Sequence, residues 1–218
     1  MRYQPGHKEE KRKELLKASG RQVKKTGFAA TGVDALMQAA GVTSGAFYSH
    51  FSSKADLLKA LIESELQASR EMWAGNPHDT AEDWLGFELD RYLNLAHVKH
   101  PEAGCVLPGL AAEIARADLS VRELYEAEML KGHEILARRL GSDDLAWVFI
   151  CQLVGAIHVA RAMPGEAMQR AIIEASKRHL REAVSQLADA SDAPDASHAR
   201  DAVKPPGAPS RGSKRTRS

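Results

Sequence analysis

Apolar residues recur at helical spacing along most of this chain, in segments that glycine and proline separate. Residues 8–25, for example, place Leu15, Leu16 and Val23 on one face, and the segment ends at Gly27. No stretch alternates apolar and polar residues for long enough to indicate a strand. The sequence therefore predicts an all-α protein.

The composition is that of an ordinary globular protein, with 44% hydrophobic and 27% charged residues. The formal net charge is only +1, but lysines and arginines crowd residues 8–25, which favours a nucleic-acid partner for that end. Nothing approaches the roughly 18 to 20 apolar residues of a membrane span. The two cysteines lack the spacing of a metal or redox site. We expect a cytoplasmic protein without metal or cofactor.

Capping residues, glycines and prolines set the bounds of the expected helices. Ser53 and Thr80 stand where N-caps stand, Thr31 is the expected cap of the segment that follows it, and Gly141 and Pro164 end helical patterns. The expected helices are 8–25, 33–40, 44–50, 54–76, one opening at residue 80, a short helix within 100–109, 120–140, 143–163 and 166–187.

Residues 26–58 carry the most informative pattern. Two short helices joined through Gly41, with apolar inner faces, are typical of a helix-turn-helix, whose second helix enters the DNA major groove. Phe47 and Phe51 of that second segment are expected in the core. Its start is small and polar, so its backbone can approach the bases closely. The residues of this start are Thr43, Ser44, Gly45 and Ala46.

Three polar side chains follow the start of the second helix. Tyr48, His50 and Lys54 offer hydroxyl, imidazole and ammonium donors that suit phosphate oxygens. Taken singly, Tyr48 also fits a half-buried core aromatic and Lys54 a solvated lysine. Together with the turn and the basic first segment, they favour phosphate contacts, which supply much of protein–DNA affinity.

The stretch "TGVDALMQAAGVTSGAFYSHFSSKADLL" resembles the DNA-binding domain of TetR-family regulators, and the resemblance is specific over roughly residues 8–60. It implies a homodimer that binds an inverted repeat, contacts phosphates with Thr31, Thr43, Tyr48, His50 and Lys54, and approaches base edges with Ser44, Gly45 and Ala46. Many family members carry Lys or Arg where this chain has Ser44. Base reading then depends on Gln38, on Ser44 itself or on DNA shape.

The resemblance also implies a division of the chain. Residues 1–53 are expected to form a three-helix helix-turn-helix domain, and residues 54–188 a helical ligand-binding and dimerisation domain. Residues 189–218, rich in Ala, Asp, Ser and Pro and then basic, are expected to be a disordered tail. A small-molecule inducer would change the separation of the two reading helices, with the helix from Lys54 as the lever.

Cys105 is a candidate sensor of redox state or electrophiles. It lies in a stretch broken by proline and glycine, where His100 and Arg116 could lower the pKa of its thiol. The string "GCVLPGLAAE" resembles the branch of the TetR family whose repressors respond to electrophiles such as N-ethylmaleimide. The alternative is a small buried hydrophobic residue, the usual state of a lone cysteine.

Broad apolar stripes on residues 143–163 and 166–187 predict the dimer interface, as an antiparallel helix pair from each subunit. The alternative is that these faces pack inside one subunit. The expected interface residues are Trp147, Cys151, Val154, Gly155, His158, Ile173, Leu180 and Val184.

Two other classes of protein remain open. One is a helical thiol-dependent enzyme using Cys105 and His100, although no second thiol, phosphate-binding glycine loop or carboxylate pair supports it. The other is an adaptor whose N-terminal helices bind a protein. Only a DNA reader would enrich a palindrome from random duplexes, with a steep dependence on salt.

Overall fold

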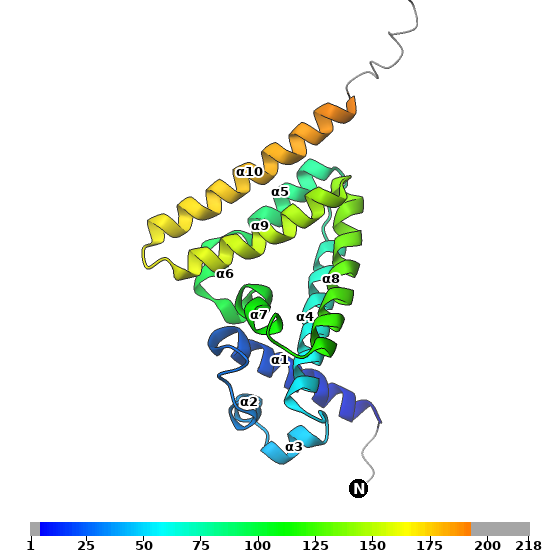
Figure 1. The fold of residues 1–218 in the computed structure, drawn as a ribbon, viewed down its shortest axis with the longest axis vertical. Coiled ribbons are helices and arrows are strands. Elements are labelled where there is room, and N and C mark those ends of the chain that lie inside the picture. Colours follow the sequence, from blue (N-terminus) through cyan, green and yellow to red (C-terminus); the bar gives the residue numbers. More distant parts are fainter. Residues whose placement is uncertain (1–4, 193–218) are drawn as a thin grey trace, which may run out of the picture.

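The computed structural model describes residues 5–192, and within that range it contains helices, turns and loops but no strand (Figure 1). The expected all-α fold is confirmed. The elements are α1 (Pro5–Thr26), α2 (Val33–Ala39), α3 (Ser44–Tyr48), α4 (Lys54–Ala74), α5 (Ala81–Tyr92), α6 (Leu95–Lys99), the 3-10 helix η1 (Pro101–Ala103), α7 (Leu107–Ile114), α8 (Leu119–Leu140), α9 (Asp143–Ala162) and α10 (Glu166–Asp192).

Two of the expected caps are present and one is wrong. The Ser53 hydroxyl accepts a hydrogen bond from the Asp56 amide, and the Thr80 hydroxyl accepts one from the Asp83 amide. The N-cap of α2 is Gly32 rather than Thr31. The Thr31 hydroxyl instead donates to the Gly27 carbonyl, 2.6 Å away, because Thr31 is buried next to the end of α1.

The segment between α5 and α8 is more helical than the sequence suggested. Asn94 caps α6 by accepting from the His97 amide. Pro101 and Pro108 fall in the first turns of η1 and α7, where a missing N–H costs nothing. The prolines therefore begin helices here. At the other end, α10 continues past the expected end at Leu187, and the rest of the expected tail, residues 193–218, lies outside the described residues.

The helices form a smaller group and a larger one, joined by α4 (Figure 1). At one end α4 contacts α1, which also packs on α2, and further along it packs against α8. Then α8 packs on α9, and α9 on α10. Although α9 is long and apolar enough to cross a membrane, these contacts make it a core helix, with Phe149 and Ile157 fully buried.

Candidate functional site

The α2–α3 pair packs on α1 through α2. Leu36 and Met37 of α2 are fully buried, and so are Phe47 and Phe51, whose ring centroids lie 5.7 Å apart. The turn between the two helices closes with the Val42 amide donating to the Met37 carbonyl at 3.0 Å. Both aromatic residues face inward as expected, so α3 has a fixed apolar support.

The opposite side of α3 faces solvent. Thr43 and Gly45 are exposed, and Tyr48 is 71% exposed, with its ring edge-on against Phe47. Gln38 of α2 is exposed as well. Ser44 and Ala46 belong to the same short helix. We call the exposed surface formed by Thr43, Gly45 and Tyr48 the α3 face.

The remaining expected contact residues lie differently. Thr31 is 4% exposed, and its hydroxyl is engaged inside the domain. His50 is half-buried, and burial, Lys8 and Arg12 lower the pKa of its imidazole. The Lys54 ammonium donates to the Ala29 carbonyl at 3.3 Å and lies 4.8 Å from the Phe28 ring centre. Thr31 is thus poorly placed for phosphate, whereas Lys54 borders the turn before α2.

The basic residues of α1 differ in their surroundings. Lys24 is engaged in an ion pair with Glu65 of α4 at 2.6 Å, and Arg12 lies over the Phe51 ring at 5.0 Å. These two fix α1 in the fold. The exposed lysines and arginines of the helix are Lys8, Lys13, Lys17, Arg21 and Lys25.

A family comparison matches this part of the chain. The family model described as "Bacterial regulatory proteins, tetR family" matches residues 15–61, from the middle of α1 into α4. Residues 15–61 thus carry a TetR-family DNA-binding domain. The segment is similar to two regulators of Pseudomonas putida, TtgR and ArpR, the second described as probable, each 41% identical over 56 residues. That match covers 26% of this chain and only 27% of either relative.

Solved structures share most of this fold at low sequence identity. The regulator from Chloroflexus aurantiacus is 22% identical with a TM-score of 0.69, and covers 83% of this chain and 96% of its own. Reduced NemR of E. coli is 19% identical with a TM-score of 0.67, covering 79% and 96%. FadR of Bacillus subtilis with stearoyl-CoA is 15% identical with a TM-score of 0.62, covering 79% and 96%. These identities establish the fold alone.

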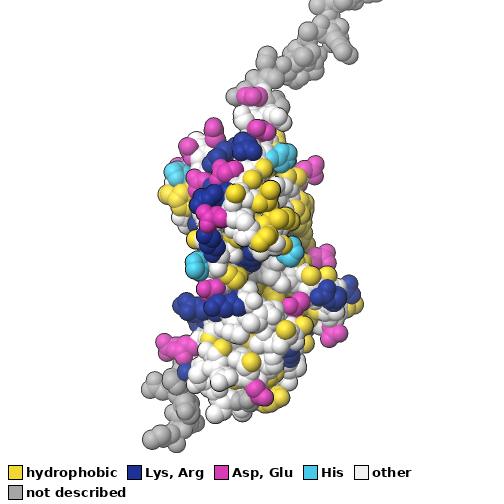
Figure 2. Space-filling model, turned by 90° about the vertical axis from the view of Figure 1, so that its left-hand side faces the viewer, with side chains coloured by type: hydrophobic (Ala, Val, Ile, Leu, Met, Phe, Trp, Pro, Cys, Tyr) yellow, Lys and Arg dark blue, Asp and Glu magenta, His cyan; other side chains and the backbone are white. Residues whose placement is uncertain are grey.

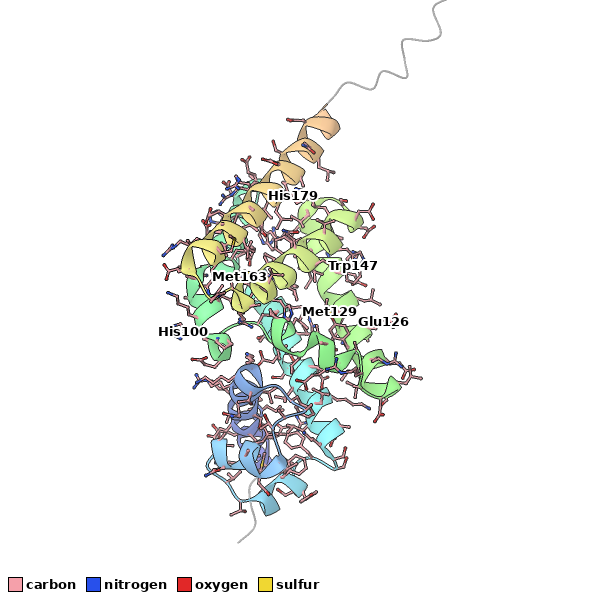
Figure 3. All side chains as sticks on the ribbon, turned by 60° about the vertical axis from the view of Figure 1, so that its left-hand side comes forward. His100, Glu126, Met129, Trp147, Met163 and His179 are labelled. Carbon is pink, nitrogen blue, oxygen red and sulfur yellow. The ribbon has the colours of Figure 1, made fainter. Side chains whose placement is uncertain are left out.

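A small cavity of about 40 Å³ lies among the larger group of helices. Its wall is mostly apolar. Trp73 of α4 and Phe149 of α9 contribute rings, and Met129 of α8, labelled in Figure 3, points inside the bundle. The other lining residues are Leu66, Ser69, Arg70, Met72, Tyr92, Cys105, Leu107, Glu128, Gly132, Ile150, Leu153 and Val154.

Few polar groups reach this cavity. Arg70 of α4 pairs with Glu128 of α8 at 2.7 Å, and Lys131 approaches the same carboxylate at 2.5 Å. The Tyr92 hydroxyl is buried and meets no hydrogen-bond partner of good geometry among the described residues. Burial and the neighbouring Cys105 thiol raise its pKa well above the ordinary value. The buried Tyr92 hydroxyl thus lies beside the Cys105 thiol at the edge of this cavity.

The expected activation of Cys105 is wrong. Burial raises the pKa of its thiol, and the hydrogen bond from the Leu107 amide offsets this only in part. His100 does not activate the thiol, because its side chain is 64% exposed and turned towards Glu102, 3.7 Å away. Arg116 lines a different groove beside Lys54 and Phe28. The Cys105 thiol is thus predominantly protonated at neutral pH.

The residue that holds this segment is His97, which the sequence analysis overlooked. Its Nε2 accepts from the Cys105 amide at 3.0 Å, and its Nδ1 lies 2.8 Å from the Tyr92 carbonyl. Since the carbonyl can only accept, Nδ1 carries the proton and the ring is neutral. Desolvation is the main cause that lowers its pKa to about 4. Gly104 before Cys105 was the only signal in the sequence of a close approach here.

The expected interface residues fall into two sets. On α9, Trp147 is 38% exposed, Cys151, Gly155 and His158 are exposed, and Val154 is half-buried at the cavity. On α10, the prediction that the expected residues form an intersubunit surface is wrong, because they are buried on the side of the helix that packs against α9 and α5. These are Ile173, Leu180 and Val184, all at most 5% exposed.

Proposed function

We propose that this protein is a cytoplasmic transcriptional repressor of the TetR family that binds an inverted repeat as a homodimer and releases it when a small molecule binds among the larger group of helices. The observation that carries this proposal is the α3 face. A small-residue helix start projects from a rigid aromatic support, as entry into a major groove requires. We keep the division into a DNA-binding part, residues 1–53, and a ligand-binding and dimerising part, residues 54–188.

Selection from a pool of random duplexes tests DNA binding. We expect enrichment of an inverted repeat, and affinity that falls steeply with salt because lysines and arginines of α1 displace counterions. Tyr48→Phe should weaken operator binding about tenfold, the loss of one hydrogen bond to phosphate. Tyr125→Phe, on α8, is the matched control and should bind as the wild type does. Absence of any preferred duplex at low ionic strength contradicts the proposal.

The proposed dimer interface is the outer face of α9 with the outer face of α10. Figure 2 shows hydrophobic side chains gathered on the upper part of the molecule, where these helices lie. Besides the exposed α9 residues already described, Val159 is 45% and Met168 55% exposed. Exposed apolar surface of this kind favours packing against a second copy of the chain, and binding to an inverted repeat also requires two subunits.

Gly155 offers a clean test of the dimer. A Cβ built there meets no atom within 4 Å, and the position is exposed, so we expect Gly155→Glu to keep the subunit fold while placing a charge in the proposed interface. We expect a monomer in sedimentation at micromolar concentration. Gly86→Glu on α5, with equal space around it, is the matched control and should remain dimeric. A dimeric Gly155→Glu variant places the interface elsewhere.

We expect the inducer to be neutral and mostly apolar, and to widen the cavity when it binds. A charged ligand would lose its hydration against an apolar wall. FadR of Bacillus subtilis, with the same fold, binds stearoyl-CoA. Leu66 and Trp73 line the cavity from the helix that starts at Lys54. Ligand binding to α4 can therefore favour one spacing of the reading helices over another.

Release by reactive electrophiles is the second candidate. Similarity to reduced NemR of E. coli is structural only, at 19% identity. The raised pKa of the Cys105 thiol disfavours it, because the thiolate is the reactive form. We therefore favour reversible binding, and expect Cys105→Ser to be released by the same compounds as the wild type.

A further inference from the structure

Glu113, at the end of α7, reaches the turn that precedes α2. Its carboxylate accepts hydrogen bonds from two successive backbone amides, those of Phe28 at 3.0 Å and of Ala29 at 2.6 Å. The two residues and Glu113 are more than 80 positions apart in the sequence. A side chain of the larger helical group thus supplies the hydrogen-bond acceptors for the segment that leads into the helix-turn-helix.

The turn is shaped for this contact. Gly27 has a φ of +81°, which side-chain-bearing residues rarely adopt, and a Cβ there would lie 2.7 Å from the Glu113 carboxylate. From the other side, the Lys54 ammonium donates to the Ala29 carbonyl. Two charged side chains, from α7 and from the start of α4, therefore hold the same short turn.

The opposite end of α7 lies at the cavity. Leu107, its first residue, lines the cavity together with Cys105 just before it. The Pro108 carbonyl accepts a hydrogen bond from Nδ1 of His158 on α9 at 2.8 Å. The short helix α7 therefore contacts the cavity at its start and the turn before α2 near its end. A displacement of α7 at the cavity would also move the Glu113 carboxylate at the turn.

We infer that Glu113 is a positioning residue for DNA binding, which sets the orientation of the α2–α3 pair and links it through α7 to the cavity. This inference rests on the proposed function for its DNA readout. Two charge-assisted hydrogen bonds to the turn restrict its backbone, and the turn fixes where α2 begins. Without them, the α3 face would present itself in a broader range of orientations and bind its operator less well.

Hydrogen exchange and operator titration of Glu113→Ala test the first half of the inference. We expect the Phe28 and Ala29 amides to exchange at least tenfold faster, since each loses a hydrogen bond that corresponds to roughly one decade, and the operator Kd to rise about tenfold. Glu123→Ala, at an exposed position of α8, is the matched control and should change neither quantity. Unchanged exchange and affinity in Glu113→Ala overturn the inference.

A double-mutant cycle tests the link to the cavity. Leu107→Val, a mild change at the cavity end of α7, is combined with Glu113→Ala, and helicity is checked by circular dichroism. We expect the operator affinities to be non-additive, with the double variant little worse than Glu113→Ala alone. Additive losses overturn the link through α7. The exchange measurement needs no DNA, so a wild type that binds no duplex refutes the proposed function and leaves the test of Glu113 intact.

Discussion

Replacing Gly104 with alanine is expected to lower the free energy of unfolding by about 3 kcal/mol, since overpacking a core costs about 1–3 kcal/mol and broken buried hydrogen bonds add to it. A Cβ at this position would lie 2.1 Å from Cδ2 and 2.2 Å from Nε2 of His97. The imidazole cannot move aside, because hydrogen bonds to Tyr92 and Cys105 hold both ring nitrogens. The Tyr92 ring also packs edge-on against it, with centroids 4.4 Å apart.

Urea unfolding followed by circular dichroism measures this loss. Gly86→Ala is the control, because a Cβ there meets nothing within 4 Å and alanine favours the interior of α5. We expect the control to gain about 0.5–1 kcal/mol, the usual difference between the two residues in a helix. A Gly104→Ala variant as stable as the wild type would mean that the His97 ring is not held in place.

Stability should fall with acidification between about pH 6.5 and pH 4 because of His97. Its pKa is lowered to about 4 in the folded protein, mainly by desolvation, and is about 6.5 in the unfolded chain. In this window the unfolded chain binds a proton that the folded protein does not, so the free energy of unfolding decreases as the pH falls. The difference corresponds to an upper value of about 3 kcal/mol. Protonation of Nε2 would also oppose the Cys105 amide, which donates to it.

The comparison of wild type with His97→Gln isolates this contribution. Other groups titrate in the same range, among them His50, whose pKa is also lowered, and Glu88, whose pKa burial raises. The contributions of these groups to the pH dependence are the same in the wild type and in His97→Gln, so they cancel in the comparison. We expect urea unfolding at pH 7 and pH 5 to show a shallower pH dependence in His97→Gln. His78→Gln, at an exposed position, should keep the wild-type dependence. Equal slopes in wild type and His97→Gln contradict the prediction.

Local sequence determined the helix-turn-helix and most helix bounds. Leu36, Gly41, Phe47 and Phe51 lie within a short stretch of chain, so their spacing alone fixes which face is buried and where the chain turns. The caps at Ser53 and Thr80 depend only on residues three positions away. An all-α fold and a helix-turn-helix with an aromatic core could therefore be predicted.

Only the tertiary structure shows which elements cover the buried helix faces. An apolar stripe shows that a helix face is buried, but not whether its own subunit or a partner covers it, and Leu180 packs within the subunit. Likewise, spacing cannot show that Cys105 loses its solvent, that His97 accepts from its amide or that Glu113 reaches Phe28. These properties depend on burial and on contacts between segments far apart in the chain, which exist only once the helices have packed.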